Sequence, residues 1–228
     1  MIASRPIVLY GHSYTPNPSK VVMILEELKI PYEHIIIDLA VVKEEPYLSI
    51  NPNGRLPAIK DPNTGITLWE SGAIVEYLVE TYDDAGALSL ASREARFHLK
   101  QWLHFQVSGQ GPYFGQLGWF KLFHPEDVPS AKERYEEQTV RVFSVLDRAL
   151  KGKKYLVGDK AYVVDTLIEK DTPPVPASPF PVPIISGSIT PFSHLQICSL
   201  AMNSNFDPEI HFPPEKSPLF TTHLELFP

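Results

Sequence analysis

The first 84 residues alternate short apolar runs with segments of helical periodicity, and the order of these elements leaves few folds open. A strand-like run at Arg5–His12 precedes helical spacing over Ser19–Ile30, and a β-branched run follows at Tyr32–Leu39. Strand, helix and strand in this order predict a parallel pair of strands joined by a crossover helix.

Two short apolar runs then flank the turn-forming residues Asp61–Gly65, which predicts a β-hairpin, and helical spacing returns over Ser71–Tyr82. One mixed four-stranded sheet with helices across it accommodates all of these elements. The sequence therefore predicts an α/β, thioredoxin-like domain over residues 5–84.

From residue 92 onward the pattern is helical, with a predicted helix over 93–108. A second helix is expected from Ser130, which forms a capping box with Glu133, to near Gly152. These segments predict an all-α domain over residues 92–160. The apolar side chains expected on and around one face of the first helix are Phe97, Trp102, Leu103 and Phe105.

The last part of the chain has a different composition. Residues 161–228 hold 12 of the 23 prolines, and no charged residue occurs between Thr172 and Phe206. Proline removes a backbone donor and bars a helix. We therefore expect an irregular, Pro-rich tail in place of packed helices.

Composition excludes several classes of protein. A net charge of −7 leaves no basic face to meet phosphate, so we expect no nucleic-acid partner. No apolar stretch is long enough to cross a membrane, and the N-terminus lacks the long apolar segment of a signal peptide. A single cysteine, Cys198, excludes an intramolecular disulfide and predicts a reducing, cytoplasmic location. The eight histidines show no ligand spacing, so we expect no metal.

A proline at the start of a predicted strand is the first candidate binding feature. If the Leu56-Pro57 bond is cis, the N–H and C=O of Leu56 point outward and can pair with an extended peptide. An ordinary loop proline is the alternative. Arg55 is placed to hold a carboxylate, or is simply a solvated loop residue.

Glu70 and Ser71 stand at the start of a predicted helix. A helix N-terminus attracts a carboxylate, and Glu70 offers a charge for an ammonium group, so the pair matches the α-amino acid end of a ligand. The simpler interpretation is that Ser71 only caps the helix.

The loop after the first strand, "GHSYTPNPSK", contains no cysteine and therefore no redox nucleophile. Ser13, Tyr14, Thr15 and Asn17 can instead donate hydrogen bonds to a thiolate that the ligand supplies, which would lower the thiol pKa. Ordinary turn chemistry before a helix is the alternative for Thr15 and Asn17.

The stretch "NPNGRLPAIKDPNTGITLWESGAIVEYL" resembles the glutathione-binding signature of the cytosolic glutathione transferases. "TPNPSKVVMILEEL" and "KQWLHFQVSGQGPYFGQ" are similar to the fungal branch related to the yeast nitrogen-regulator prion domain and to bacterial nu-class enzymes. The resemblance covers about residues 5–160. It implies a thioredoxin-like domain, a helical domain, usually a homodimer, and γ-Glu-Cys-Gly as ligand and co-substrate.

The resemblance also implies roles for particular residues. Leu56 pairs with the cysteinyl unit, Glu70 and Ser71 hold the γ-glutamyl end, and Lys43 is a candidate for the glycyl carboxylate. The implied glutathione-binding residues are Arg55, Leu56, Pro57, Glu70, Ser71 and Lys43. The implied catalytic residues, which face the sulfur, are Ser13, Thr15 and Asn17. The implied electrophile pocket consists of Tyr113, Phe114, Trp119 and Phe120, which are equally well explained as core or dimer-interface aromatics.

The expected function is conjugation of glutathione to a small electrophile, or its use as a reductant, in detoxification or fungal secondary metabolism. One alternative is a glutathione-binding regulatory protein without turnover. After "YLVGDK" the sequence departs from the family pattern across Ala161–Gln196, as a translated intron or a shifted frame would produce. A defective gene product is therefore the other alternative.

Overall fold

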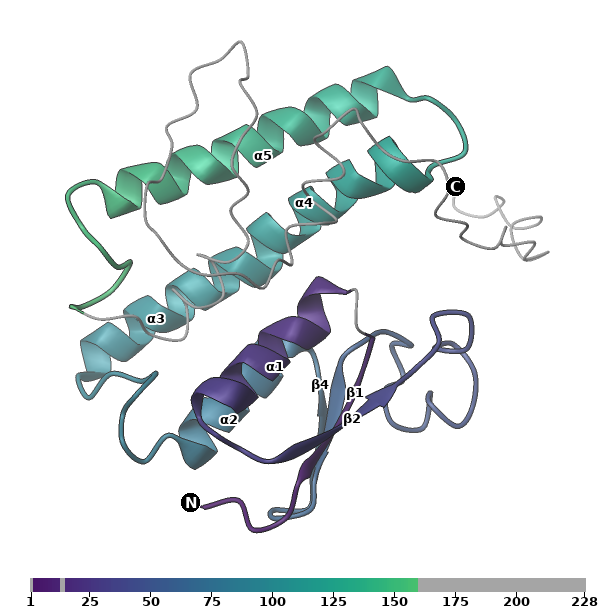
Figure 1. Cartoon of the computed structure of the whole chain (residues 1–228). Helices are drawn as coiled ribbons and strands as arrows, with labels where there is room; N and C mark the ends of the chain where they lie inside the picture. The colour runs from purple at the N-terminus through teal and green to yellow at the C-terminus, as the bar shows by residue number, and fades with distance from the viewer. Residues whose placement is uncertain (1, 13–14, 160–228) are drawn as a thin grey trace, which may run out of the picture.

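The computed structural model describes residues 2–12 and 15–159, which form an α/β domain followed by a layer of long helices (Figure 1). The strands and helices are, in chain order, β1 (Ile7–Gly11), α1 (Pro16–Glu27), β2 (Tyr32–Ile36), β3 (Ala58–Asp61), β4 (Ile66–Trp69), α2 (Ser71–Tyr82), α3 (Arg93–Phe105), the π-helical turn η1 (Gln106–Gln110), α4 (Gly111–Gly118), the π-helical turn η2 (Trp119–Phe123) and α5 (Pro129–Leu150).

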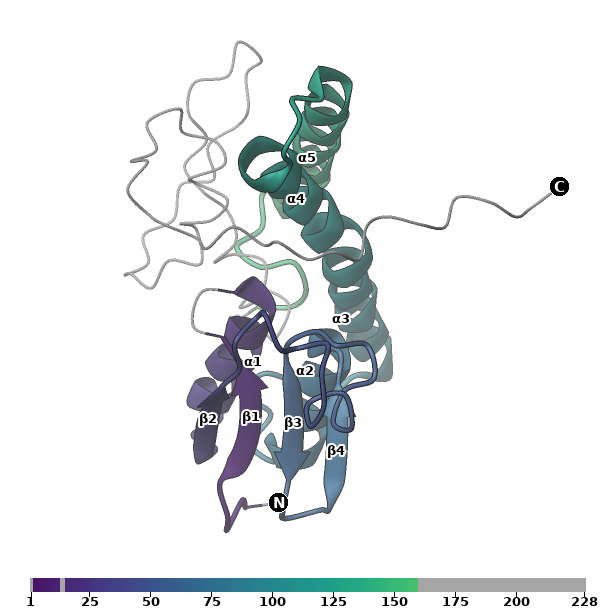
Figure 2. The ribbon, with the colours of Figure 1, turned by 90° about the vertical axis from the view of Figure 1, so that its right-hand side faces the viewer.

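The four strands form one mixed sheet, as the sequence predicts, and their order in it is β2-β1-β3-β4. β1 pairs with β2 in parallel, whereas β3 pairs with both β1 and β4 in antiparallel fashion. Helices α1 and α2 lie side by side on one face of the sheet (Figures 1 and 2). The crossover from β1 through α1 to β2 accounts for the parallel pair.

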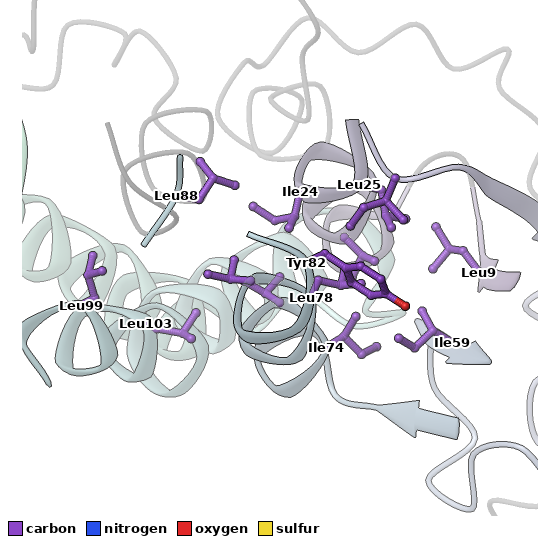
Figure 3. Close-up of a cluster of buried hydrophobic side chains, with 14 of the residues drawn as sticks. Leu9, Ile24, Leu25, Ile59, Ile74, Leu78, Tyr82, Leu88, Leu99 and Leu103 are labelled. Carbon is purple, nitrogen blue, oxygen red and sulfur yellow. The ribbon is translucent and has the colours of Figure 1, made fainter. Parts of the chain in front are cut away.

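One apolar core contains side chains of the sheet, of α1, of α2 and of α3. Leu9 and Ile59 come from the sheet, Ile74 and Leu78 from α2, and all four are fully buried. Figure 3 shows that the cluster continues from α2 to the side chains of α3, including Leu103. The α/β domain and the helical domain therefore share buried side chains.

The helical run after α2 is longer than the sequence predicts. Helix does not end near residue 108 but continues through η1, α4 and η2 to Phe123, despite several glycines. α5 then packs against α4, and Phe114 meets Phe143 with ring centroids 5.2 Å apart. Apolar contacts between the two helices offset the weak helix propensity of glycine.

Two expectations about this domain are wrong. α5 begins at Pro129 with Val128 as its N-cap residue and no side-chain cap, so Ser130 and Glu133 do not form a capping box. Phe97 is not part of the buried face of α3; its side chain is 61% exposed, while Leu99 and Leu103 are buried. The helix register places Phe97 on the outer side because Leu99 and Leu103, four residues apart, occupy the inner side.

The predicted Pro-rich tail, residues 161–228, lies outside the described residues, as do Ser13 and Tyr14. Among the helices of residues 2–12 and 15–159, none is both long and apolar enough to cross a bilayer. No cluster of His, Cys, Asp or Glu suited to a metal occurs within the same ranges.

A buried carboxylate holds the predicted hairpin turn. Asp61 is 2% exposed and accepts hydrogen bonds from the hydroxyls of Tyr77 (2.6 Å) and Tyr82 (2.5 Å). Asn63 adds two more, from its backbone N–H (2.8 Å) and side-chain amide (2.9 Å). Burial alone would raise the pKa of Asp61, but these donors together outweigh it and lower the pKa below its ordinary value.

The Tyr82→Phe substitution should lower the free energy of unfolding by about 1.5–3 kcal/mol at neutral pH, because it removes a donor to a buried charge. Since the folded pKa of Asp61 is lowered, its stabilising effect is complete above the unfolded value of about 3.9 and is lost as the pH falls through the folded pKa. The difference in free energy of unfolding between wild type and Tyr82→Phe should therefore become smaller as the pH is lowered. Urea unfolding at several values from pH 7 to pH 3 measures it.

Tyr32→Phe is the control, since the Tyr32 hydroxyl donates to an exposed carboxylate, Glu26, at 2.8 Å. It should cost less than Tyr82→Phe at neutral pH. Two results would contradict the role of Asp61: equal losses of unfolding free energy in the two variants, or a loss in Tyr82→Phe that does not change with pH.

Candidate active site

The strand register brings three loops to one edge of the sheet. Tyr10 near the end of β1 pairs with Ala58 at the start of β3, and Ala58 pairs with Trp69 at the end of β4. The chain therefore leaves β1, enters β3 and leaves β4 at the same edge, called here the loop edge. Helices α1 and α2 both begin there (Figure 2). All the predicted binding residues at 55–57 and 70–71 lie at this edge.

Buried side chains anchor the backbone of Arg55 and leave its guanidinium outside. The Tyr47 hydroxyl and the Asn51 side-chain amide both donate to the Arg55 carbonyl, at 2.7 and 2.6 Å. Tyr47 and Asn51 are buried, whereas Arg55 is exposed. Burial raises the pKa of Tyr47, so its hydroxyl remains a donor at neutral pH. The loop is thus held by its main chain, and the arginine side chain remains accessible to a ligand.

The backbone of Leu56 is available for pairing. The Leu56-Pro57 bond is cis, and Pro57 is buried. The ladder with β1 and β4 begins only at Ala58. Within residues 2–12 and 15–159, neither the N–H nor the C=O of Leu56 has a hydrogen-bond partner. An extended peptide lying along this edge could form both bonds.

The start of α2 differs in one detail from the prediction. Glu70, not Ser71, is the N-cap residue, and neither side chain caps the helix. Ser71 is the first helical residue and is 7% exposed. The first helical hydrogen bond joins the Ile74 N–H to the Glu70 carbonyl at 2.9 Å. The N–H groups of residues 71–73 precede it and are oriented as in helix ends that bind anions.

Glu70 itself has an unusual backbone conformation. Its φ of 71° and ψ of 114° lie in a region that residues with a Cβ seldom adopt. Such conformations cost about 1–3 kcal/mol and are concentrated at functional sites. Its carboxylate is exposed and reaches the Asn53 side-chain amide at 3.5 Å. The Glu70 carboxylate therefore lies at the N-terminus of α2 and remains exposed.

The first turn of α1 offers donors mainly through Asn17. The Thr15 hydroxyl donates to the His12 carbonyl at 3.1 Å, so its single hydrogen is already used. Pro16 and Pro18 have no backbone N–H. Asn17 lies between them, is exposed, and contributes both a backbone N–H and a side-chain amide. Ser13, the third predicted residue of this loop, lies outside the described residues.

Comparisons with known proteins show the family of this chain. The family model for the glutathione S-transferase N-terminal domain matches residues 9–86, and that for the C-terminal domain matches residues 112–168. The glutathione S-transferase-like protein gedE of Aspergillus terreus is 54% identical over 170 residues, which cover 70% of this chain and 74% of gedE.

The chain belongs to the glutathione S-transferase family.

Solved structures place it in the Ure2 branch of that family, as the motifs predict. The glutathione transferase URE2P6 from Phanerochaete chrysosporium, solved in complex with oxidized glutathione, shares 45% identity with a TM-score of 0.69, over 72% of this chain and 76% of that one. The nitrogen regulation fragment of the yeast prion protein Ure2p shares 32% identity with a TM-score of 0.68, over 72% of this chain and 79% of the fragment.

In this glutathione S-transferase, Lys43 lies against the Arg55 loop. A Cβ added to Gly54 would stand 3.2 Å from Cγ of Lys43 and 3.0 Å from the carbonyl oxygen of Val42. The Lys43 side chain is therefore beside the loop edge and is exposed. Lys43 therefore packs against the residue that precedes Arg55.

The four aromatics predicted for the electrophile pocket do not share one set of contacts, although the rings of Trp119 and Phe120 both lie near His124, at 6.4 and 5.0 Å. Phe114 is buried against α5, which favours the core interpretation for this residue. Tyr113 is half-buried and faces the guanidinium of Arg141 at 5.5 Å. Trp119 and Phe120 belong to η2, where Phe120 stacks on Tyr135 at 5.6 Å and Trp119 stacks on Phe123 at 6.1 Å. Side-chain contacts therefore do not join the four into one wall.

Sequence reasoning missed Tyr47 and Asn51, which orient the Arg55 loop. The Asn51-Pro52 dipeptide was the available signal, since Asn-Pro marks a turn that a side-chain amide can organise. Nothing local points to Tyr47, because its partner is eight residues away and the contact depends on how the loop folds back.

Replacing Gly54 with alanine should destabilise the loop more than an equivalent change elsewhere. Gly54 has φ of 59° and Gly86 has φ of 68°, so alanine costs about 1–2 kcal/mol at both. At Gly86 an added Cβ meets nothing within 4 Å, whereas at Gly54 it would stand 3.0 Å from the carbonyl oxygen of Val42, which is closer than an ordinary contact. Crowding of this kind adds about 1–3 kcal/mol. Urea unfolding of Gly54→Ala and Gly86→Ala measures the difference, and equal losses would contradict the close packing of Val42 and Lys43.

Proposed function

We propose that this glutathione S-transferase binds glutathione at the loop edge and either conjugates it to a small electrophile or uses it as a reductant. The observation that carries the proposal is the juxtaposition of the unpaired Leu56 backbone with the first turn of α2. A γ-Glu-Cys-Gly peptide is extended and charged at both ends. It requires a strand-like backbone partner flanked by sites for its charged groups, and the loop edge offers both.

Each part of glutathione has a matching group. The γ-glutamyl carboxylate meets the N–H groups of Ser71 and Gly72, and the ammonium meets Glu70. The cysteinyl unit pairs with Leu56, beside Pro57. The glycyl carboxylate lies toward Arg55 and Lys43. The opposite charges of Glu70 and of these two cations then define the direction in which the peptide binds.

The proposed chemistry needs a thiolate, since the thiolate is the nucleophile. Hydrogen bonds to the sulfur anion lower the thiol pKa. Asn17 offers the donors of the α1 turn, while Thr15 would first have to release His12. Ser13 remains part of the proposed catalytic set. Detoxification and fungal secondary metabolism both use such a reaction, and Tyr113, Trp119 and Phe120 remain the proposed contacts for the electrophile.

We also propose that the protein is a cytoplasmic homodimer. A cytoplasmic location is supported by the single cysteine of the chain. A homodimer is supported by Phe97, a large aromatic side chain left exposed on α3, since aromatic residues are enriched at protein interfaces. Light scattering coupled to size exclusion tests the dimer.

A glutathione-binding regulatory protein is the second candidate, and the similarity to the nitrogen regulation fragment of Ure2p favours it. Turnover of glutathione with a generic aryl halide separates the two candidates. Conjugate formation above the uncatalysed rate supports the enzyme. Binding of glutathione without turnover of halides or of disulfide and peroxide substrates supports the regulator. Sequencing the transcript across codons 155–205 tests the alternative of a defective gene product.

The Glu70→Ala substitution should weaken glutathione binding by about 1.5–3 kcal/mol, because it removes a charge-assisted bond to the ligand ammonium. Isothermal titration calorimetry measures the affinity. Glu33→Ala is the control, since Glu33 is exposed and is the second residue of β2, at the end of that strand away from the loop edge. Unchanged affinity in a folded Glu70→Ala variant would remove Glu70 from the site.

The thiol pKa of bound glutathione should lie below that of free glutathione and should rise in Asn17→Ala. Thr15→Val should have the smaller effect, because the Thr15 hydroxyl already donates to His12. Titration of thiolate ultraviolet absorbance in each complex gives the pKa. A wild-type value equal to that of free glutathione would contradict catalysis, and a larger effect of Thr15→Val would reverse the assignment of the sulfur partner.

A further inference from the structure

A buried hydrogen bond links α1 to the helical domain. The ammonium of Lys20 donates to Oε1 of Gln106 at 3.0 Å, and the two residues are 4% and 2% exposed. Lys20 lies three residues after Asn17, one turn further along α1. Gln106 is the first residue of η1. The bond therefore joins residues 86 positions apart and spans the two domains.

The next residue of η1 touches the other ligand-binding helix. A Cβ added to Gly72 would stand 3.1 Å from Cγ1 of Val107, so the Val107 side chain lies directly over the first turn of α2. Gly72 follows Ser71, and its N–H is one of those proposed to meet the γ-glutamyl carboxylate. Adjacent residues of η1 thus contact α1 near the proposed sulfur site and α2 at the proposed γ-glutamyl site.

The π-helical geometry of η1 helps to explain this double contact. The Gly111 N–H bonds to the Gln106 carbonyl, five residues back, so the turn is wider than an α-helical turn. Successive side chains diverge less in a wider turn than in an α-helix. Gln106 and Val107 consequently reach two neighbouring helices, α1 at Lys20 and α2 at Gly72. Single π turns within α-helices are often found at functional sites.

We propose that η1 is a positioning element that sets the separation between the two ends of the glutathione site. Gln106 holds α1 through the positioning residue Lys20, and Val107 holds α2 by packing on Gly72. The inference rests on the proposed function and adds that the helical domain, through η1, positions the glutathione site. An error of about 1 Å between a bound group and its reacting partner can lower a rate by roughly a hundredfold, so such a support would matter for catalysis.

The α1 contact is tested with Lys20→Met, Gln106→Met and Gln106→Glu. The two methionine variants remove the bond while keeping side-chain length, and the glutamate variant keeps an acceptor for Lys20. We expect both methionine variants to lower kcat by about tenfold, with little change in KM for glutathione, and to raise the thiol pKa of bound glutathione. Gln106→Glu should retain most of the wild-type kcat and the wild-type thiol pKa.

Comparing Lys20→Met with Gln106→Met separates the effect of positioning α1 from a direct effect of the Lys20 charge. Gln106→Met leaves the Lys20 charge in place, so a direct effect of that charge on the thiolate would survive it. If Lys20→Met alone changes kcat and the thiol pKa, the positioning role of Gln106 is overturned. If neither methionine variant changes them, in a protein whose circular dichroism is that of the wild type, the inference for α1 is also overturned.

The contact between Val107 and α2 is tested by adding a methyl group at Gly72 and then shortening Val107. Gly72→Ala should raise the Kd for glutathione by about tenfold, because the new methyl group pushes against Val107. Adding Val107→Ala to that variant should restore most of the affinity. Gly115→Ala is the control, since a Cβ at Gly115 in α4 meets nothing within 4 Å. Wild-type affinity in Gly72→Ala, or failure of Val107→Ala to restore it, overturns this half of the inference.

These outcomes are distinguishable from failure of the proposed function. The wild-type protein is measured first, by calorimetry with glutathione and by thiolate titration of the complex. Absence of binding in the wild type contradicts the proposed function and the inference together. Wild-type binding with a lowered thiol pKa upholds the function, and the Gln106 and Gly72 variants then decide the inference alone.

Discussion

Burial of α2 between the sheet and α3 is the constraint on which the rest of the structure depends. Ile74 and Leu78 are fully buried, and the side chains around them come from β1, β3, α1 and α3 (Figure 3). Each side chain of this size contributes about 1.5–3 kcal/mol when it is buried. The same packing joins the two domains and sets the place of the first turn of α2. The N-terminal end of that helix, where we propose that glutathione binds, is therefore as well fixed as the core itself.

Buried polar groups hold the two ends of β3 in place. Asp61, at the end away from the loop edge, is satisfied by two tyrosine hydroxyls and Asn63. Asn51, near the other end, donates to the Arg55 carbonyl and accepts from the Asn53 N–H at 2.9 Å. Buried polar groups of this kind stabilise only when each has a partner, and together they then specify one arrangement. The hairpin and the Arg55 loop are thereby both attached to one short strand.

Much of the fold could be predicted from the sequence because its signals are local. The β-branched runs, the hairpin at Asp61–Gly65 and the helix Ser71–Tyr82 agree with the structure. The helical run past residue 108 could not be predicted, since glycine propensity argues against it. Packing of α4 on α5, where Phe114 meets Phe143, offsets that cost. The exposure of Phe97 likewise depends on which side of α3 faces the core.

For the site, the sequence by itself determined the chemical groups: a Leu-Pro pair before a strand, a Glu-Ser pair at a helix start, and a cysteine-free loop before α1. Tertiary structure decided which of these groups are available. It engages the Thr15 hydroxyl with His12, fixes Arg55 by its carbonyl, and joins Lys20 to Gln106 in the other domain. The physical reason is that residue type sets what a side chain can donate or accept. Whether that capacity is already used depends on neighbours that the fold brings together from distant parts of the chain.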